Sequence, residues 1–201
     1  MALKLVIVRH GRVAHLKQRI CYGWTDMELD EDGIGDARRA GSLLSGEQFD
    51  AAYASPLLRT RQTAEIILSQ NQTEKKPSIH FMEGLKEYHF GCWEGVPYDT
   101  VKTDYELQWK QYIKGDKDFS IKDGEAIGGF LTRVWGSVDE ICSRHEDGTV
   151  LIVSHFGCIS TIIPHLLGYE GGLDWKFAVD PGGISTVEIN GDYARLSKLN
   201  M

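Results

Sequence analysis

The chain has few of the features that mark secreted, membrane-spanning or zinc-stabilised proteins. Only four of its 201 residues are cysteines, and no two of them form a C-x-x-C pair. We therefore expect free thiols in a reducing cytoplasm, and neither a disulfide framework nor a structural zinc site. Nowhere do about 18 uncharged apolar residues run together. The apolar run at residues 3–8 is followed at once by charge, so we also expect no signal sequence and no membrane partner.

An excess of positive charge is also missing. Lys and Arg number 22 against 29 Asp and Glu, which gives a formal net charge of −7. Proteins that coat nucleic acids or lie on anionic membranes usually present a basic face, so the charge argues against both roles. It permits an anionic small molecule, because a few arginines in one pocket can bind phosphate in a protein that is acidic overall.

The hydrophobic pattern that is present predicts strands alternating with helices. Three short, largely apolar runs predict buried strands, namely residues 3–8, 49–55 and 149–155. Two further strands flank the turn Asn190-Gly191-Asp192, which is typical of a hairpin. The length and the alternation predict a single α/β domain over residues 1–201, built on a largely parallel sheet.

Helices are predicted from periodicity and capping residues. One follows Asp30, one is opened by Ser55-Pro56, one spans about residues 124–145, and one runs from Gly157 to Gly168. Residues 88–122 break the alternation, because they are rich in aromatic and charged side chains and contain one helix, at about 98–113. We interpret them as a helical insertion over the sheet edge, a natural place for a lid or a substrate wall.

Polar residues follow three of the predicted strands at the point where each strand ends. They are Arg9-His10-Gly11, the segment from Ser55 to Arg59, and Ser154-His155. In an open α/β sheet, ligands bind beyond the carboxyl ends of the strands. Two arginines and two histidines brought together there make a phosphate site in composition, although a lone histidine after a strand is more often structural.

Four segments in order give these residues a family context: VRHGR, SPLLRTRQTAEI, LKEYHFGCWEG and VSHFG. Together they resemble the histidine phosphatase superfamily, also called phosphoglycerate-mutase-like, from about residue 5 to residue 160. The resemblance implies a three-layer α/β/α sandwich. It also implies a phosphomonoester hydrolase that acts through a phosphohistidine intermediate on a small phosphorylated metabolite and requires no metal or other cofactor.

Carried over residue by residue, the resemblance implies a role for each strand-end residue. His10 matches the phosphorylated nucleophile, and Arg9 and Arg59 match the arginines that bind the phosphoryl group. His155, in its charged form, matches the histidine that binds a phosphoryl oxygen. Glu87 matches the acid that gives a proton to the leaving group, provided that burial raises its pKa.

Five further residues are candidates for substrate binding. Arg12 stands where the family often has Glu or Gln, and it either adds a cation at the pocket mouth or is solvent-exposed. Tyr22 and Gly23 belong to CYGWTDMELDEDG, which resembles a signature common in alpha-ribazole phosphatases of cobalamin assembly, although mutases have a similar motif. The others are Tyr88 and Phe156. Aromatic residues of the insertion either stack on a bulky ring of the substrate or form the insertion's own core.

Two other functions remain as alternatives. A cofactor-dependent phosphoglycerate mutase is disfavoured because Tyr88 stands where the mutases that the chain resembles have Arg, and because no arginine occurs between Arg61 and Arg133. A non-catalytic phosphate-binding module is disfavoured because the matches to the nucleophile and the acid are both present. Arg61 lies two residues beyond Arg59 and is expected at the surface, since the two point to different sides of a helix.

Overall fold

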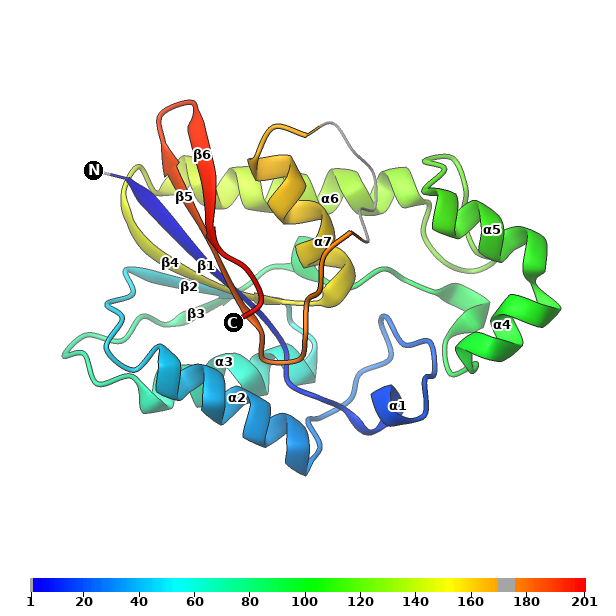
Figure 1. Cartoon of the computed structure of the whole chain (residues 1–201), viewed down its shortest axis with the longest axis horizontal. Helices are drawn as coiled ribbons and strands as arrows, with labels where there is room; N and C mark the ends of the chain where they lie inside the picture. Colours follow the sequence, from blue (N-terminus) through cyan, green and yellow to red (C-terminus); the bar gives the residue numbers. More distant parts are fainter. Residues whose placement is uncertain (1, 170–175) are drawn as a thin grey trace.

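The computed structural model describes residues 2–169 and 176–201. Within these residues, six strands form one sheet in the order β3-β2-β4-β1-β5-β6 (Figure 1). The parallel strands are β1 (Leu3–Arg9), β2 (Ala51–Ala54), β3 (Ile79–Phe81) and β4 (Gly148–Ser154). The antiparallel strands are β5 (Ile184–Asn190) and β6 (Tyr193–Lys198). The predicted α/β fold with a mostly parallel sheet is confirmed, as is the C-terminal hairpin.

Helices pack against both faces of the sheet. Figure 1 shows α2 (Glu31–Leu43) and α3 (Leu58–Gln70) on one side, and α6 (Ile127–Arg144) and α7 (Phe156–Leu166) on the other. Side chains alternate along a strand, so β1 contributes to two apolar clusters. Its odd-numbered leucine and isoleucine residues pack with α6 and α7, and its even-numbered valines pack with α2 and α3. The run at residues 3–8, apolar except for Lys4, is therefore that of a strand buried on both faces.

Two helices begin later than predicted. In both, a residue at or before the observed start forms a hydrogen bond with another part of the chain. The helix after Ser55-Pro56 begins at Leu58, whose backbone N–H donates to Asp26 at 2.6 Å. The helix predicted from about residue 124 begins at Ile127, since the Glu125 carboxylate accepts a hydrogen bond from the backbone of residue 89. By contrast, α2 begins as predicted, with the Asp30 carboxylate accepting from Gly33 N–H at 2.8 Å.

The predicted insertion is a helical segment that lies on the side toward which β1 and β4 run (Figure 1). Two short 3-10 turns, η1 (Glu83–Leu85) and η2 (Gly91–Trp93), lead into α4 (Tyr98–Asp104) and α5 (Glu106–Lys114). The single helix predicted at 98–113 is thus two helices, interrupted at Tyr105, whose ring packs 6.0 Å from that of the fully buried Trp93. A short helix, α1 (Ala14–Lys17), lies in the connection from β1 to α2.

The cysteines and the hydropathy of the helices are the last two features of the fold. All four cysteines are free thiols, and Cys21 and Cys158 are buried. Across residues 2–169 and 176–201, no helix is both long and apolar enough to cross a membrane.

Candidate active site

Sheet register brings the polar strand ends side by side. Arg9 at the end of β1 pairs with Ser154 at the end of β4, so the residues that follow, His10 and His155, leave the sheet together. Their ring centroids lie 5.2 Å apart. Strand β2 ends one position earlier against β4, which places Ser55 beside the same pair. Three segments far apart in the sequence therefore form one site, as the strand-end pattern predicted.

The tautomer of His10 is set by its own loop. Its Nδ1 lies 2.7 Å from the carbonyl oxygen of Gly11, an acceptor, so Nδ1 carries the proton and Nε2 carries the lone pair. Burial, reinforced by the positive charges of Arg59 and Arg9, lowers the pKa of His10 well below its usual range. His10 is therefore neutral near pH 7, with Nε2 available as a nucleophile.

Gly11 allows this loop to pass under helix α2. A Cβ at this position would lie 2.2 Å from the carbonyl oxygen of Gly33, a distance that real side chains do not tolerate. The Gly11 N–H donates to the Thr63 hydroxyl of α3 at 3.0 Å. The glycine of the Arg-His-Gly motif is therefore needed for close packing, and it fixes the backbone that orients His10.

His155, Arg59 and Ser55 form a fully buried hydrogen-bonded group behind His10. Arg59 Nε donates to His155 Nδ1 at 3.3 Å, so the proton of His155 is on Nε2, which lies 2.8 Å from the Ser55 hydroxyl. Burial, followed by the charge of Arg59, lowers the pKa of His155 well below its usual range. Here the neutral ring is favoured, because burial penalises the charged form and the neighbourhood is already cationic. A charged His155 beside a bound phosphoryl group stays a prediction.

Arg9 presents an unsatisfied donor close to His10. One terminal nitrogen donates to the carbonyl oxygen of Val179 at 2.6 Å, and the guanidinium lies 5.3 Å from the ring centroid of Phe156. Its Nε is buried and has no hydrogen-bond partner among residues 2–169 and 176–201. Buried donors are almost always paired in folded proteins, so this orphan N–H is consistent with a site that is completed by an anionic ligand.

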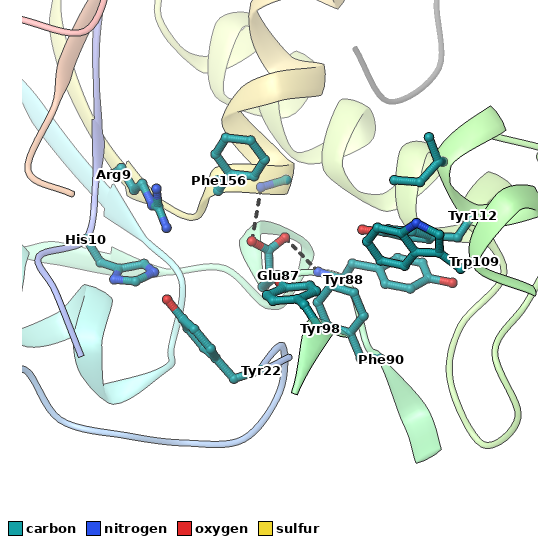
Figure 2. A pocket seen from close by; sticks show the side chains of 12 residues that line it. Arg9, His10, Tyr22, Glu87, Tyr88, Phe90, Tyr98, Trp109, Tyr112 and Phe156 are labelled. Carbon is teal, nitrogen blue, oxygen red and sulfur yellow. Dashed lines mark hydrogen bonds between the residues drawn. The ribbon is translucent and has the colours of Figure 1, made fainter. Parts of the chain in front are cut away.

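Glu87 lies across the cavity from His10 (Figure 2). Its two carboxylate oxygens accept from the backbone N–H groups of Tyr88, at 2.9 Å, and Gly157, at 3.0 Å. A Cβ on Gly157 would lie 2.4 Å from the carboxylate, so glycine is needed for this contact. Burial raises the pKa of Glu87 despite these hydrogen bonds and the nearby charges of Arg59 and Arg9. The raised pKa extends to higher pH the range in which the carboxyl group holds a proton, as a general acid requires.

Glu94, seven residues later, has the opposite character. Burial alone would raise its pKa, but hydrogen bonds from the Thr25 hydroxyl and from the backbone of residues 23–25 lower it overall. The carboxylate accepts from the N–H groups of Gly23, Trp24 and Thr25, and from that of Phe90. Its oxygens are directed at these donors, so Glu94 anchors one loop to another.

An ion pair between Arg133 and Glu125 holds the segment that carries Glu87. From α6, Arg133 donates to the carbonyl oxygens of Gly84 and Lys86 and, at 2.8 Å, to that of Glu87 itself. Its remaining N–H groups donate to the Glu125 carboxylate, at 2.6 and 2.8 Å. This pair fixes the backbone on the N-terminal side of Glu87. Nothing in the sequence marked it, because neither residue lies in a family segment or at a strand end.

A cavity of about 250 Å³ connects these groups to the helical insertion. Of the ten predicted site residues, those that line it are Arg9, His10, Tyr22, Glu87, Tyr88 and Phe156. The other lining residues are Phe90, Tyr98, Trp109, Tyr112, Ile113 and Gly157. Of these, the sequence indicated the four aromatic residues only as members of the aromatic-rich insertion, and it did not single out Ile113 or Gly157 as site residues. The aromatic members all belong to the aromatic-rich insertion. Trp93 is part of the insertion's own core, and these four aromatic residues line the cavity. Stacking on a ring of the substrate stays a prediction.

The remaining four predicted residues lie around the cavity rather than in its wall. Arg59 and His155 form the buried group behind His10, and Gly23 accepts a hydrogen bond from Arg59 at 2.6 Å through its carbonyl oxygen. Arg12 is 40% exposed and turns toward Asp36, 3.4 Å from Nε. Arg61 is exposed, as expected, and lies over the ring of residue 81. In the described part of the chain, no three His, Cys, Asp or Glu side chains gather as metal ligands.

Comparison with known proteins agrees with this geometry. A family model for the histidine phosphatase superfamily (branch 1) matches residues 5–201. The chain is 29% identical to the adenosylcobalamin/alpha-ribazole phosphatase of Escherichia coli K12, over 98% of this chain and 96% of the relative. It is 28% identical to phosphoserine phosphatase 1 of Hydrogenobacter thermophilus, over 99% and 92% of the two chains. The crystal structure of the alpha-ribazole phosphatase from Shigella flexneri superposes with a TM-score of 0.87 at 28% identity, covering 98% of this chain and 96% of that one. The chain therefore belongs to the histidine phosphatase superfamily and is an enzyme of its phosphatase type.

Proposed function

We propose that this protein hydrolyses phosphate monoesters of small metabolites through a phosphohistidine intermediate on His10, without a metal ion. The observation that carries the proposal is the position of two groups with complementary protonation across one cavity. His10 is buried and neutral, with its lone pair on Nε2, and Glu87 is buried with a raised pKa. Phosphoryl transfer from an ester with a poor leaving group requires a neutral nucleophile and a protonated general acid. The pKa values of His10 and Glu87 are shifted in the directions that favour these two forms.

In the first step, His10 Nε2 attacks phosphorus in line with the ester oxygen. Arg9, with its unpartnered Nε, and Arg59 offset the charge on the equatorial oxygens. A phosphoryl dianion near His155 favours the protonated form of that ring, whose positive charge then adds to that of the two arginines. Glu87 gives its proton to the departing alcohol oxygen as the P–O bond breaks.

In the second step, water releases phosphate from the phosphohistidine. The Glu87 carboxylate, now ionised, accepts a proton from the attacking water, which restores both groups to their initial states. His10 leaves as the neutral imidazole because Nδ1–H remains bonded to the carbonyl oxygen of Gly11.

The proposal includes the finer predictions made from the sequence. We assign residues 1–201 to one catalytic domain of three-layer α/β/α type, with an insertion at about 88–122. Alpha-ribazole 5'-phosphate is the leading candidate substrate, because relatives from Escherichia coli and Salmonella typhi are named for it and match almost the full chain. Tyr88 lines the cavity where mutases similar to this chain have Arg, which supports hydrolysis over transfer to a second acid.

The test is phosphate release in the presence of EDTA from a panel that contains alpha-ribazole 5'-phosphate, 3-phosphoglycerate with its bisphosphate cofactor, and 4-nitrophenyl phosphate. We expect EDTA-resistant hydrolysis by the wild type and a loss of about 10⁴-fold or more in His10→Ala. His80→Ala is the matched control, since His80 is exposed on β3. Activity in His10→Ala within about tenfold of wild type, or activity abolished by EDTA, would refute the mechanism.

A further inference from the structure

We infer that the end of the cavity distant from His10 is a binding site for the alcohol part of the ester, and that it selects an uncharged alcohol carrying an aromatic ring. This inference rests on the proposed hydrolysis at His10 and specifies its substrate class. The site is formed by the aromatic wall, which we define as Phe90, Tyr98, Trp109 and Tyr112, with Ile113 at its mouth.

The wall lies on the leaving-group side of the cavity. Figure 2 shows Arg9 and His10 on one side of Glu87, and Tyr88, Trp109 and Tyr112 on the other. In-line attack by His10 places the departing oxygen on the side of phosphorus away from His10, where Glu87 can protonate it. The group attached to that oxygen must then extend beyond Glu87, toward the aromatic wall.

Charge decides which groups this wall accepts. Among the described residues that line the cavity, the one arginine, Arg9, and the one carboxyl group, Glu87, lie near the phosphoryl position. The aromatic wall contains no Lys or Arg. A substrate carboxylate would lose its hydration among aromatic rings without gaining a cationic partner, which is strongly unfavourable. Lys102 lies 5.6 Å from the Trp109 ring centroid, but it is already 3.5 Å from the Asp99 carboxylate.

The geometry of the rings favours a flat partner. Tyr98 and Trp109 meet edge to face with centroids 6.1 Å apart, and Trp109 and Tyr112 are tilted at 5.8 Å. Edges and faces presented in this way suit an added aromatic ring, which gains both apolar burial and quadrupole attraction.

Size limits the alcohol to about one ring close to the phosphate. An apolar cavity of roughly 150 Å³ is enough to hold benzene, and this cavity measures about 250 Å³. A phosphoryl group and one ring therefore fill it. Ile113 is 46% exposed at the mouth, so the remainder of a larger substrate would extend past it into solvent.

The experiment compares kcat/KM for four primary alkyl phosphates: benzyl phosphate, ethyl phosphate, O-phospho-L-serine and 3-phosphoglycerate. We expect benzyl phosphate to exceed ethyl phosphate by about 10- to 100-fold, the gain from burying one ring. The kcat/KM values of O-phospho-L-serine and 3-phosphoglycerate should be lower than that of ethyl phosphate, because desolvation of the carboxylate costs more free energy than its contacts with the wall return.

A pair of matched variants tests the location of the selectivity. Ile113→Arg places a cation at the cavity mouth, and it should raise kcat/KM for O-phospho-L-serine relative to benzyl phosphate by about tenfold. Leu107→Arg adds the same charge to the same helix, but Leu107 is 75% exposed and does not line the cavity. It should leave the ratio unchanged.

Each outcome supports or overturns one proposal. If O-phospho-L-serine or 3-phosphoglycerate is hydrolysed with a higher kcat/KM than benzyl phosphate, the inferred substrate class is wrong while the hydrolase function stands. If the two arginine variants change the ratio equally, the selectivity does not come from this wall. If the wild type releases phosphate from none of the four esters or from the panel used to test His10, the hydrolase function and the inference fall together.

Discussion

The two ends of the cavity are built in different ways. At the phosphate end, His10, His155 and Arg59 are fixed by hydrogen bonds to neighbouring strand ends and loops, with every ring nitrogen proton assigned by an acceptor or donor. At the other end, the aromatic wall is held by ring packing in a helical segment outside the sheet. Hydrogen bonds fix direction, which in-line transfer needs, whereas ring packing fixes volume and polarity.

This difference separates reaction from selection, with Glu87 at the border. Changes at the phosphate end should lower the turnover of all esters together, because every ester passes through the same phosphoryl transfer. Changes at the aromatic wall should alter the ratio between esters. Changes near Glu87 should lower turnover and also alter the ratio between esters, and the size of the effect depends on how much the leaving group needs a proton.

The largest effect that we expect at the border is that of Glu87→Gln. Alkyl esters such as ethyl phosphate should lose about 10²- to 10⁴-fold in kcat/KM, because an amide cannot protonate the alcohol. For 4-nitrophenyl phosphate, whose leaving group is stable as an anion, phosphorylation of His10 should fall by about tenfold or less. Single-turnover kinetics with both esters measures the two losses, and equal losses would show that Glu87 does not act as the acid.

The same variant should change the pH profile. The raised pKa of Glu87 means that its acid form survives above the usual carboxyl range, and activity on alkyl esters falls as pH rises through that pKa. The lowered pKa of His10 means that the nucleophile stays neutral until the pH falls below its usual range. We therefore expect a bell-shaped profile whose alkaline limb disappears in Glu87→Gln. A limb that persists would assign it to another group.

Parts of the site that come from strand ends were predictable from the sequence. Residues 3–8 are apolar except for Lys4, which predicted a buried strand with His10 following its carboxyl end. The same argument placed His155 after β4, and parallel register then brought the two rings to 5.2 Å. Local pattern and topology agree here, so few alternatives existed.

Other parts depended on contacts between segments that no local pattern records. Ser55 was expected to cap a helix, but that helix begins only at Leu58. The Ser55 hydroxyl accepts from Leu57 N–H at 3.3 Å and also lies against His155, while Asp26 accepts from Leu58 N–H. The neutral state of His155 follows from burial beside Arg59, which only the folded arrangement shows. Arg133 reaches three carbonyl oxygens of a distant turn, and no periodicity predicts such a contact.

A smaller effect is expected for Arg133→Met, which keeps most of the side-chain volume and removes the hydrogen bonds to the Glu87 segment. Because Arg133 acts by positioning Glu87, kcat on ethyl phosphate should fall by about tenfold, with little change for 4-nitrophenyl phosphate. Arg144→Met is the matched control, since Arg144 lies on the same helix and pairs with Glu140 at the surface. Equal losses on both esters would indicate a general loss of structure, which thermal unfolding of the two variants would reveal.

The smallest effect is expected for Arg12→Ala, which tests where the cavity ends. Arg12 follows the His10 loop in sequence, yet its side chain turns away to Asp36 and Asp32 and does not line the cavity. We expect kcat/KM to change by less than about twofold for esters with and without a second negative group, because the guanidinium contacts neither the phosphoryl position nor the aromatic wall. The free energy of unfolding should fall by about 0–1 kcal/mol, since the ion pair is partly exposed. A loss of activity confined to esters with a second negative group would instead place Arg12 in contact with substrate and extend the cationic end of the cavity beyond Arg9.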